Sequence, residues 1–261
     1  MNRRTSLLWA AALVLSATSQ LQAADLFWQG GTRILTDANY TNTDGTAALS
    51  SPLPGDVINF GAGGTATFDG TADFGKLRVG HNQATLSTLN GTGTVTINNG
   101  AQLTLTAGAS GVGNAAMWVG AANGTAPNGT LNIDNATVTA NRLVVVGYGN
   151  NVNRTGTVNI TNGGKLILLD GNLTLAERTG SSNGVQGYVN MDGATSELSV
   201  NQAHLIIGNY GAKAAYNQTN GTATISNQII VGQRNSDNSS FSISGGAITA
   251  GGAMNVSNGT T

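Results

Sequence analysis

Residues 143–168 read LVVVGYGNNVNRTGTVNITNGGKLIL, and this stretch decides the fold. Three short runs rich in β-forming residues, 143–147, 156–160 and 165–168, are separated by corners of Gly and Asn. No part of the stretch shows the apolar period of an amphipathic helix. The pattern therefore predicts one coil of a solenoid, built from three short strands.

Copies of these three runs occur on both sides of the stretch. The first run recurs with its end at Gly80, Gly120, Gly147, Ala176, Gly208, Gly232 and Ser257. The second recurs at 93–97, 129–133, 187–191, 216–218 and 241–243, and the third at 103–105, 138–140, 198–200, 223–225 and 248–250. A period in the twenties to thirties with three strands per period is typical of a parallel β-helix.

We therefore predict an all-β chain that folds as a right-handed parallel β-helix with three short strands per coil and an N-terminal cap. Within a strand such as 95–97, Val95 and Ile97 are expected to point inward and Thr96 outward. Gly and Asn at the corners supply the positive φ values that sharp turns need. A β-propeller or β-sandwich is the main rival, but a propeller blade needs four strands in about forty residues.

The N-terminal residues predict export and a boundary. Arg3 and Arg4, an apolar run from Leu7 to Val14 and small residues before Ala24 form the three parts of a secretory signal, so we assign 1–23 to a signal peptide. The apolar run is too short for a permanent membrane anchor. Residues 24–75 are expected to form the N-terminal cap and first β segment, and 76–261 the β-helix repeats.

Composition excludes several classes of protein. The chain has 38 Gly but only 3 Pro, and Gly follows no three-residue period, which excludes a collagen-like helix. Loss of Arg3 and Arg4 reduces Lys+Arg from 11 to 9 against 12 Asp+Glu, a net charge of −3, which argues against a nucleic-acid partner. With no Cys, the exported chain has neither disulfides nor Cys-based metal sites.

Two sequence features together resemble a known family. The N-terminal segment reads FWQGG at 27–31, PGD at 54–56 and INF at 58–60, and the repeats have the form of GTVNITNGG at 156–164. Together with the signal peptide, this resembles the passenger-type β-helix repeats of bacterial autotransporters and similar surface-sorted proteins. The resemblance implies a surface-displayed rod, often adhesin-like. The chain lacks the amphipathic strands of a membrane barrel, and it ends at a corner, Asn258 to Thr261, so we expect it to be a fragment whose repeats continue.

The repeats offer few candidates for catalysis. A polysaccharide lyase needs carboxylates that converge on Ca²⁺ with an Arg or Lys base, and a glycoside hydrolase needs carboxylates a few ångströms apart. The acidic residues from 77 onward are expected in different coils, mostly as turn formers: Asp134, Asp170, Glu177, Asp192, Glu197 and Asp237. We interpret Glu177 and Arg178 as a solvated corner pair. His81 and His204 fall in different coils, which argues against a shared metal site or a nucleophile relay.

The sequence offers two alternative binding surfaces, one aromatic and one rich in Thr. Trp28 and Tyr40 could form an aromatic platform for sugars, but the sequence favours a role for them in the N-terminal cap. Outward Thr residues could form a flat face for ice or a crystalline polysaccharide, but Asn132, Asn159, Asn190 and Asn217 interrupt the row. The Thr residues concerned are Thr94, Thr96, Thr104, Thr106, Thr137 and Thr139.

The sequence therefore favours a non-catalytic, exported structural or adhesive β-solenoid, secreted or at the surface of a Gram-negative-type bacterium. We assign no catalytic, cofactor-binding or metal-binding residue and expect no cofactor. Surface polysaccharide or matrix components are the expected partners, with end-to-end self-association and an outer-membrane link through a missing C-terminal region. The alternative is a carbohydrate-binding or polysaccharide-degrading β-helix similar to pectate lyases.

Overall fold

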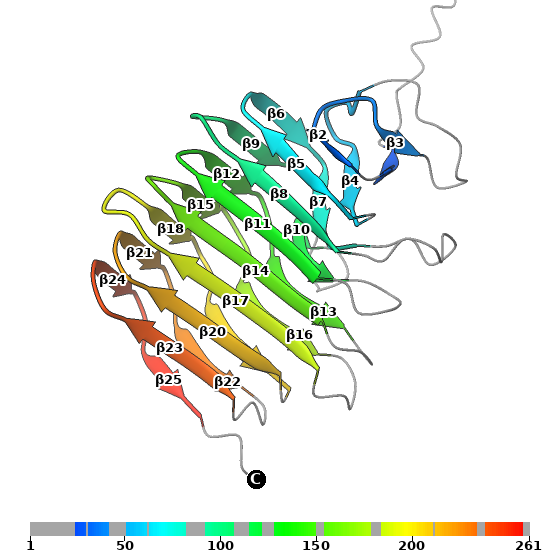
Figure 1. Cartoon of the computed structure of the whole chain (residues 1–261). Helices are drawn as coiled ribbons and strands as arrows, with labels where there is room; N and C mark the ends of the chain where they lie inside the picture. Colours follow the sequence, from blue (N-terminus) through cyan, green and yellow to red (C-terminus); the bar gives the residue numbers. More distant parts are fainter. Residues whose placement is uncertain are drawn as a thin grey trace, which may run out of the picture.

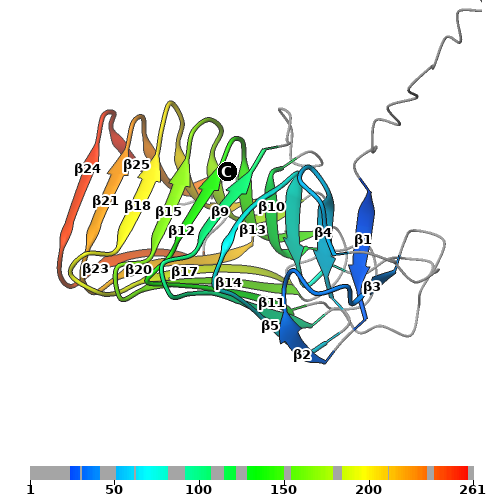
Figure 2. The same cartoon turned by 90° about the horizontal axis from the view of Figure 1, so that it is seen from above.

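Three parallel sheets that run the length of the molecule form the described part of the chain (Figures 1 and 2). The computed structural model describes residues 24–29, 31–41, 51–61, 63–81, 92–106, 115–121, 128–149, 154–178, 184–210, 212–233 and 238–257. The assigned signal peptide lies outside these residues. The chain winds so that each coil from β4 to β24 contributes one strand to each sheet, and the N-terminal and C-terminal coils lie at opposite ends (Figure 1).

The first-run strands form a ten-stranded sheet. Its order is β25-β22-β19-β16-β13-β10-β7-β4-β1-β3. The bounds are β1 (Asp25–Trp28), β3 (Tyr40–Thr41), β4 (Val57–Phe60), β7 (Lys76–Val79), β10 (Met117–Ala121), β13 (Val144–Gly149), β16 (Leu173–Arg178), β19 (Leu205–Asn209), β22 (Ile229–Gln233) and β25 (Met254–Val256). All neighbours pair in parallel except β1 and β3, which are antiparallel.

The second-run strands form an eight-stranded sheet in the order β2-β5-β8-β11-β14-β17-β20-β23. The bounds are β2 (Thr32–Ile34), β5 (Thr65–Phe68), β8 (Gly93–Ile97), β11 (Asn128–Asp134), β14 (Arg154–Thr161), β17 (Val185–Met191), β20 (Lys213–Gln218) and β23 (Ser239–Ile243). Equivalent residues of the repeat are hydrogen-bonding neighbours, so that Thr157 pairs with Thr130 on one side and Tyr188 on the other.

The third-run strands form a seven-stranded sheet in the order β24-β21-β18-β15-β12-β9-β6. The bounds are β6 (Thr71–Phe74), β9 (Gln102–Leu105), β12 (Thr137–Ala140), β15 (Lys165–Leu168), β18 (Glu197–Val200), β21 (Thr222–Ile225) and β24 (Ala247–Ala250). In Figure 2 these strands lie side by side in chain order. The predicted parallel β-helix with three strands per coil is confirmed, and the propeller and sandwich alternatives are wrong because successive coils pair strand on strand.

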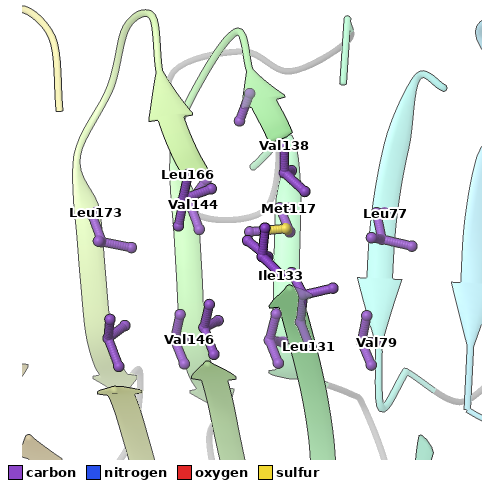
Figure 3. Packing of buried hydrophobic residues seen from close by; sticks show 14 of the residues in the cluster. Leu77, Val79, Met117, Leu131, Ile133, Val138, Val144, Val146, Leu166 and Leu173 are labelled. Carbon is purple, nitrogen blue, oxygen red and sulfur yellow. The ribbon is translucent and has the colours of Figure 1, made fainter. Parts of the chain in front are cut away.

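Apolar columns fill the interior between the sheets. Strand β14 alternates between buried and half-buried residues along its whole length, with Val158 and Ile160 fully buried. Figure 3 shows the column that runs through Leu77, Met117, Val144 and Leu173 on successive strands of the ten-stranded sheet. Strands in a sheet are about 4.8 Å apart, so each inward side chain touches its equivalent in the next coil, and the column excludes water.

The corners have the backbone that the sequence predicted. Asn99, Asn135 and Asn162 follow the second-run strands of three successive coils, with φ of 56°, 48° and 53°. The end of the first run has positive φ as well, at Gly147 (79°) for example, and at the same place in the next coil Ala176 takes a φ of 54°. Asn and Gly tolerate this region at little cost.

The N-terminal segment extends the same sheets. β1 and β4 pair in parallel with the first-run column, and β5 and β6 join the other two sheets, so coils are present from Asp25 onward. β3 then covers the outer edge of β1. Trp28 packs on Tyr40 and Phe60, with ring centroids 5.3 and 4.8 Å apart, and closes the core at this end.

Candidate functional site

The outer face of the eight-stranded sheet carries the most regular set of polar side chains in the described residues. Its two central rows run at right angles to the strands, because each residue pairs with its equivalent in the next coil. One row is Thr65, Thr94, Thr130, Thr157, Tyr188, Ala215 and Ser240, and the other is Thr67, Thr96, Asn132, Asn159, Asn190, Asn217 and Ser242. Along each strand, these half-buried row residues alternate with buried residues such as Val158 and Ile160, because successive side chains point to opposite faces of a strand.

Hydrogen bonds join the Asn residues into a ladder. Each Nδ2 donates to the oxygen one coil nearer the N-terminus, at 3.0 Å from Asn217 to Asn190, 2.9 Å from Asn190 to Asn159 and 2.8 Å from Asn159 to Asn132. The ladder ends where Asn132 donates to the hydroxyl of Thr96 at 3.1 Å. Stacked amides in register stabilise parallel strands, so this row supports the coil-to-coil register and also gives the face its chemistry.

Charged groups lie at the margins of this face. At the C-terminal ends of its strands, the Asp134 carboxylate accepts from the Asn162 amide at 2.6 Å, and the Asp192 carboxylate accepts from the Thr219 hydroxyl at 2.8 Å. At the opposite ends, Lys213 is exposed and pairs with Gln186 of the neighbouring strand. The central rows contain no charged residue from β5 to β23.

The aromatic member of the central rows is Tyr188. It lies half-buried on β17 between Thr157 and Ala215, and its hydroxyl donates to Oε1 of Gln186 at 2.7 Å. Tyr188 is half-buried, so part of its side chain is exposed beside the small side chain of Ala215. A ring of this kind beside amides and hydroxyls is suited to sugars, which combine apolar C–H surfaces with hydroxyl groups.

The Thr residues that the sequence pointed to do not form one face. Thr94 and Thr96 lie on β8 of the eight-stranded sheet, whereas Thr104, Thr137 and Thr139 lie on β9 and β12 of the seven-stranded sheet. The expected interruption of the row is confirmed, because Asn132 pairs directly with Thr96. The continuous face is therefore a mixed surface of amides and hydroxyls, and a Thr-only array is wrong.

The carboxylates of the repeat are separated and held by neighbours. Asp170 pairs with Arg142, and Glu197 lies 3.2 Å from Lys165 on the seven-stranded sheet. Asp134 and Asp192 share a row but have Thr161 between them, so about two strand spacings, or roughly 10 Å, separate them. Asp237 lies outside the described residues. In the described part of the chain, no group of three or more His, Cys, Asp or Glu side chains could hold a metal ion.

Glu177 corrects one expectation. We expected a solvated corner pair with Arg178, but Glu177 is only 8% exposed. It belongs to β16, where it pairs with Tyr148 and Asn209 of the adjacent coils, and its Oε2 accepts from the Asn209 amide at 2.8 Å. The strand continues past the positive-φ residue Ala176, so the side chain lies between two coils and out of the solvent.

The two histidines are separate, as expected. His81 lies next to Trp118 with ring centroids 5.8 Å apart. His204 precedes β19, four strands further along the ten-stranded sheet, and its Nδ1 accepts from the backbone N–H of Gln228 at 3.3 Å.

The aromatic platform proposed for Trp28 and Tyr40 is wrong. Both side chains are 1% exposed, and the Tyr40 hydroxyl donates to the Leu35 carbonyl at 2.6 Å. Burial, followed by the nearby Asp37 carboxylate, raises the pKa of Tyr40 above its ordinary value. These residues therefore belong to the closed N-terminal end of the core.

Sequence reasoning missed a second apolar cluster, on the outer side of the ten-stranded sheet. Ala115, Trp118 and Val145 are buried there, with Leu143 and Tyr148 packed against them. Trp118 stacks on Tyr148 with centroids 5.9 Å apart, and the Arg78 guanidinium lies 4.7 Å from the Trp118 ring centroid. Burial lowers the pKa of Arg78, and the Asp25 carboxylate at 3.5 Å opposes that shift.

The signal for this cluster was present in the sequence. Runs such as Val144-Val145-Val146 and Leu205-Ile206-Ile207 are apolar throughout, while most copies of the second and third runs alternate. A strand without alternation is buried on both faces. Val145 is indeed 0% exposed although its neighbours Val144 and Val146 take the two inward positions.

No protein-family model, no curated protein and no solved structure matches the chain. Among the residues that the structure describes, no helix has the length and apolar character needed to cross a membrane.

Proposed function

We propose that this chain is an exported structural or adhesive β-solenoid, of the passenger type displayed by autotransporters, at the cell surface or in the extracellular matrix. The observation that carries the proposal is the outer face of the eight-stranded sheet, where successive coils place amides and hydroxyls in register. Individually weak contacts become strong when many are made at once, because every contact after the first is intramolecular.

The location follows from the N-terminal sequence. Residues 1–23 have the basic, apolar and small-residue parts of a secretory signal, and the repeats carry few charges. We propose that the mature chain starts near Ala24 and is secreted or held at the surface of a Gram-negative-type bacterium.

A retention experiment tests this role. Cells that express the chain should yield a processed protein in the surface or matrix fraction, with an N-terminal sequence that begins near Ala24. The purified chain should sediment with cells or matrix material and should be released by dilution only slowly. An unprocessed protein that remains in the cell, or a purified chain that stays in the supernatant, would contradict the proposal.

The alternative, degradation of an acidic polysaccharide, predicts a different result. An active enzyme would release unsaturated or reducing ends from uronate polymers, with or without Ca²⁺. We expect no such ends, because the carboxylates of the described repeats bind Lys165, Arg142 or neighbouring amides and hydroxyls. New ends that increase with the amount of purified chain would favour the enzyme instead.

A further inference from the structure

The Asn ladder leaves at least half of each amide unused. An Asn side chain has two N–H donors and a carbonyl oxygen with two lone pairs. Asn159 uses one N–H to bind Asn132 and one lone pair to accept from Asn190, and Asn190 is engaged in the same way. Each amide therefore keeps one donor and one acceptor, on side chains that are half-buried and reachable from solvent.

These groups form a two-dimensional array. Neighbouring amides are about 4.8 Å apart along the ladder, and the hydroxyls of Thr130 and Thr157 lie two residues before Asn132 and Asn159, about 6.6 Å away along the strand. Tyr188 continues the hydroxyl row on the next strand. A long, extended ligand could thus contact equivalent groups on several coils at once.

The distribution of charge selects the class of ligand. The two central rows are uncharged from β5 to β23, and charged side chains such as Asp134, Asp192 and Lys213 lie at the margins of this face. A polyanion such as a uronate polymer or a nucleic acid requires clustered Lys and Arg. A neutral polymer whose hydroxyls both donate and accept matches the paired donor and acceptor of each amide, and its ring faces match Tyr188.

We infer that the outer face of the eight-stranded sheet binds a neutral, extended polysaccharide, through the amides of Asn132, Asn159, Asn190 and Asn217, the hydroxyls of Thr130 and Thr157, and the ring of Tyr188. This inference rests on the adhesive role proposed above and gives it a site and a ligand class. The affinity arises from repetition along the ladder, with one set of contacts for each coil.

Sedimentation with insoluble polysaccharides tests the site. The full chain is mixed with microcrystalline cellulose or with chitin, and the bound fraction is measured against protein concentration. Thr157→Glu places a negative charge in the centre of the face, and Tyr188→Ala removes the ring. We expect each variant to reduce the apparent affinity about tenfold or more, the range of a central contact at an interface. Tyr188→Phe, which keeps the ring, should retain most of the binding.

The matched control is Thr139→Glu. Thr139 has a similar half-buried, outward position on β12, but it belongs to the seven-stranded sheet. This variant should bind like the original chain. Circular dichroism and thermal unfolding of all variants check that the rod remains folded.

The outcomes of these experiments distinguish failure of the proposed polysaccharide site from failure of the proposed adhesive role. Binding that Thr157→Glu and Thr139→Glu reduce equally, or that neither reduces, would overturn the assignment to this face. A chain that sediments with cells or matrix but binds neither neutral polysaccharide would also overturn the inference and leave the adhesive role standing. A chain that binds neither cells, matrix nor polysaccharide would contradict both.

Discussion

Each side chain in the inward columns is enclosed by apolar neighbours from the adjacent coils. Val146 and Ile160 are both 0% exposed, and each has an apolar partner from the coil before and the coil after. Some buried polar groups are instead held by hydrogen bonds, as where the Tyr216 hydroxyl donates to Oε1 of Gln218 at 2.8 Å. Burial also raises the pKa of Tyr216, which keeps that hydroxyl protonated as a donor.

At this scale we predict that Ile160→Asp prevents stable folding. The substitution buries a carboxylate among Ile133, Met191 and other apolar neighbours with no cation to pair with it. The expected loss is about 4 kcal/mol or more in the free energy of unfolding. The control is Thr157→Asp on the same strand, where the side chain points outward. Thermal unfolding by circular dichroism compares the two, and a cooperative β-type transition of Ile160→Asp near that of the original chain would show that the column is misplaced.

The second-run strands pass close to the ends of the first-run strands. A Cβ added to Gly156 would lie 2.1 Å from the Val119 carbonyl oxygen and 2.4 Å from the Gly147 nitrogen. Gly129 and Gly187 meet backbone atoms at similar distances in the neighbouring coils. Ala214 takes this place one coil further, so the requirement for Gly belongs to the coils from Gly129 to Gly187.

We predict that Gly156→Ala forces β14 away from the ends of β10 and β13. The methyl group would collide with backbone that cannot rotate away, and the expected cost is about 3 kcal/mol, near the upper range for an overpacked core. Gly70→Ala is the matched control, since its methyl group would meet only the Phe68 ring at 3.6 Å. That variant should change stability by less than about 1 kcal/mol. Denaturant unfolding measures both, and equal midpoints would refute the close approach.

The whole molecule is a one-dimensional stack whose two ends differ. At the N-terminal end β3 covers β1, and aromatic residues close the core. On the last described strands of two sheets, Ile243 of β23 and Met254 and Val256 of β25 are 37%, 47% and 66% exposed, whereas the residues paired with them one coil earlier are buried. In such a stack stability is a sum of terms within coils and between neighbours, so a coil with one neighbour is the weakest.

This asymmetry predicts a gradient of hydrogen exchange in the full chain. Amides of β14 and β15, which have coils on both sides, should exchange slowest, and those of β23 and β24 fastest, by at least about tenfold. Mass spectrometry of peptic fragments can follow the exchange. Equal protection of β15 and β24 would mean that the last coil is covered in solution, for example by the end-to-end self-association expected from the sequence.

The sequence alone determined the coil. Short strands that alternate in polarity and end in Gly or Asn can bury their apolar side only by stacking on copies of themselves, so the period fixed the parallel sheets and the register of Thr130 on Thr157. The tertiary structure determined the contacts between coils and those on the outer faces of the sheets. The burial of Glu177, the partners of each carboxylate and the hydrogen bonds of the ladder from Asn132 to Asn217 depend on contacts between residues about 27 or more positions apart, which no local pattern encodes.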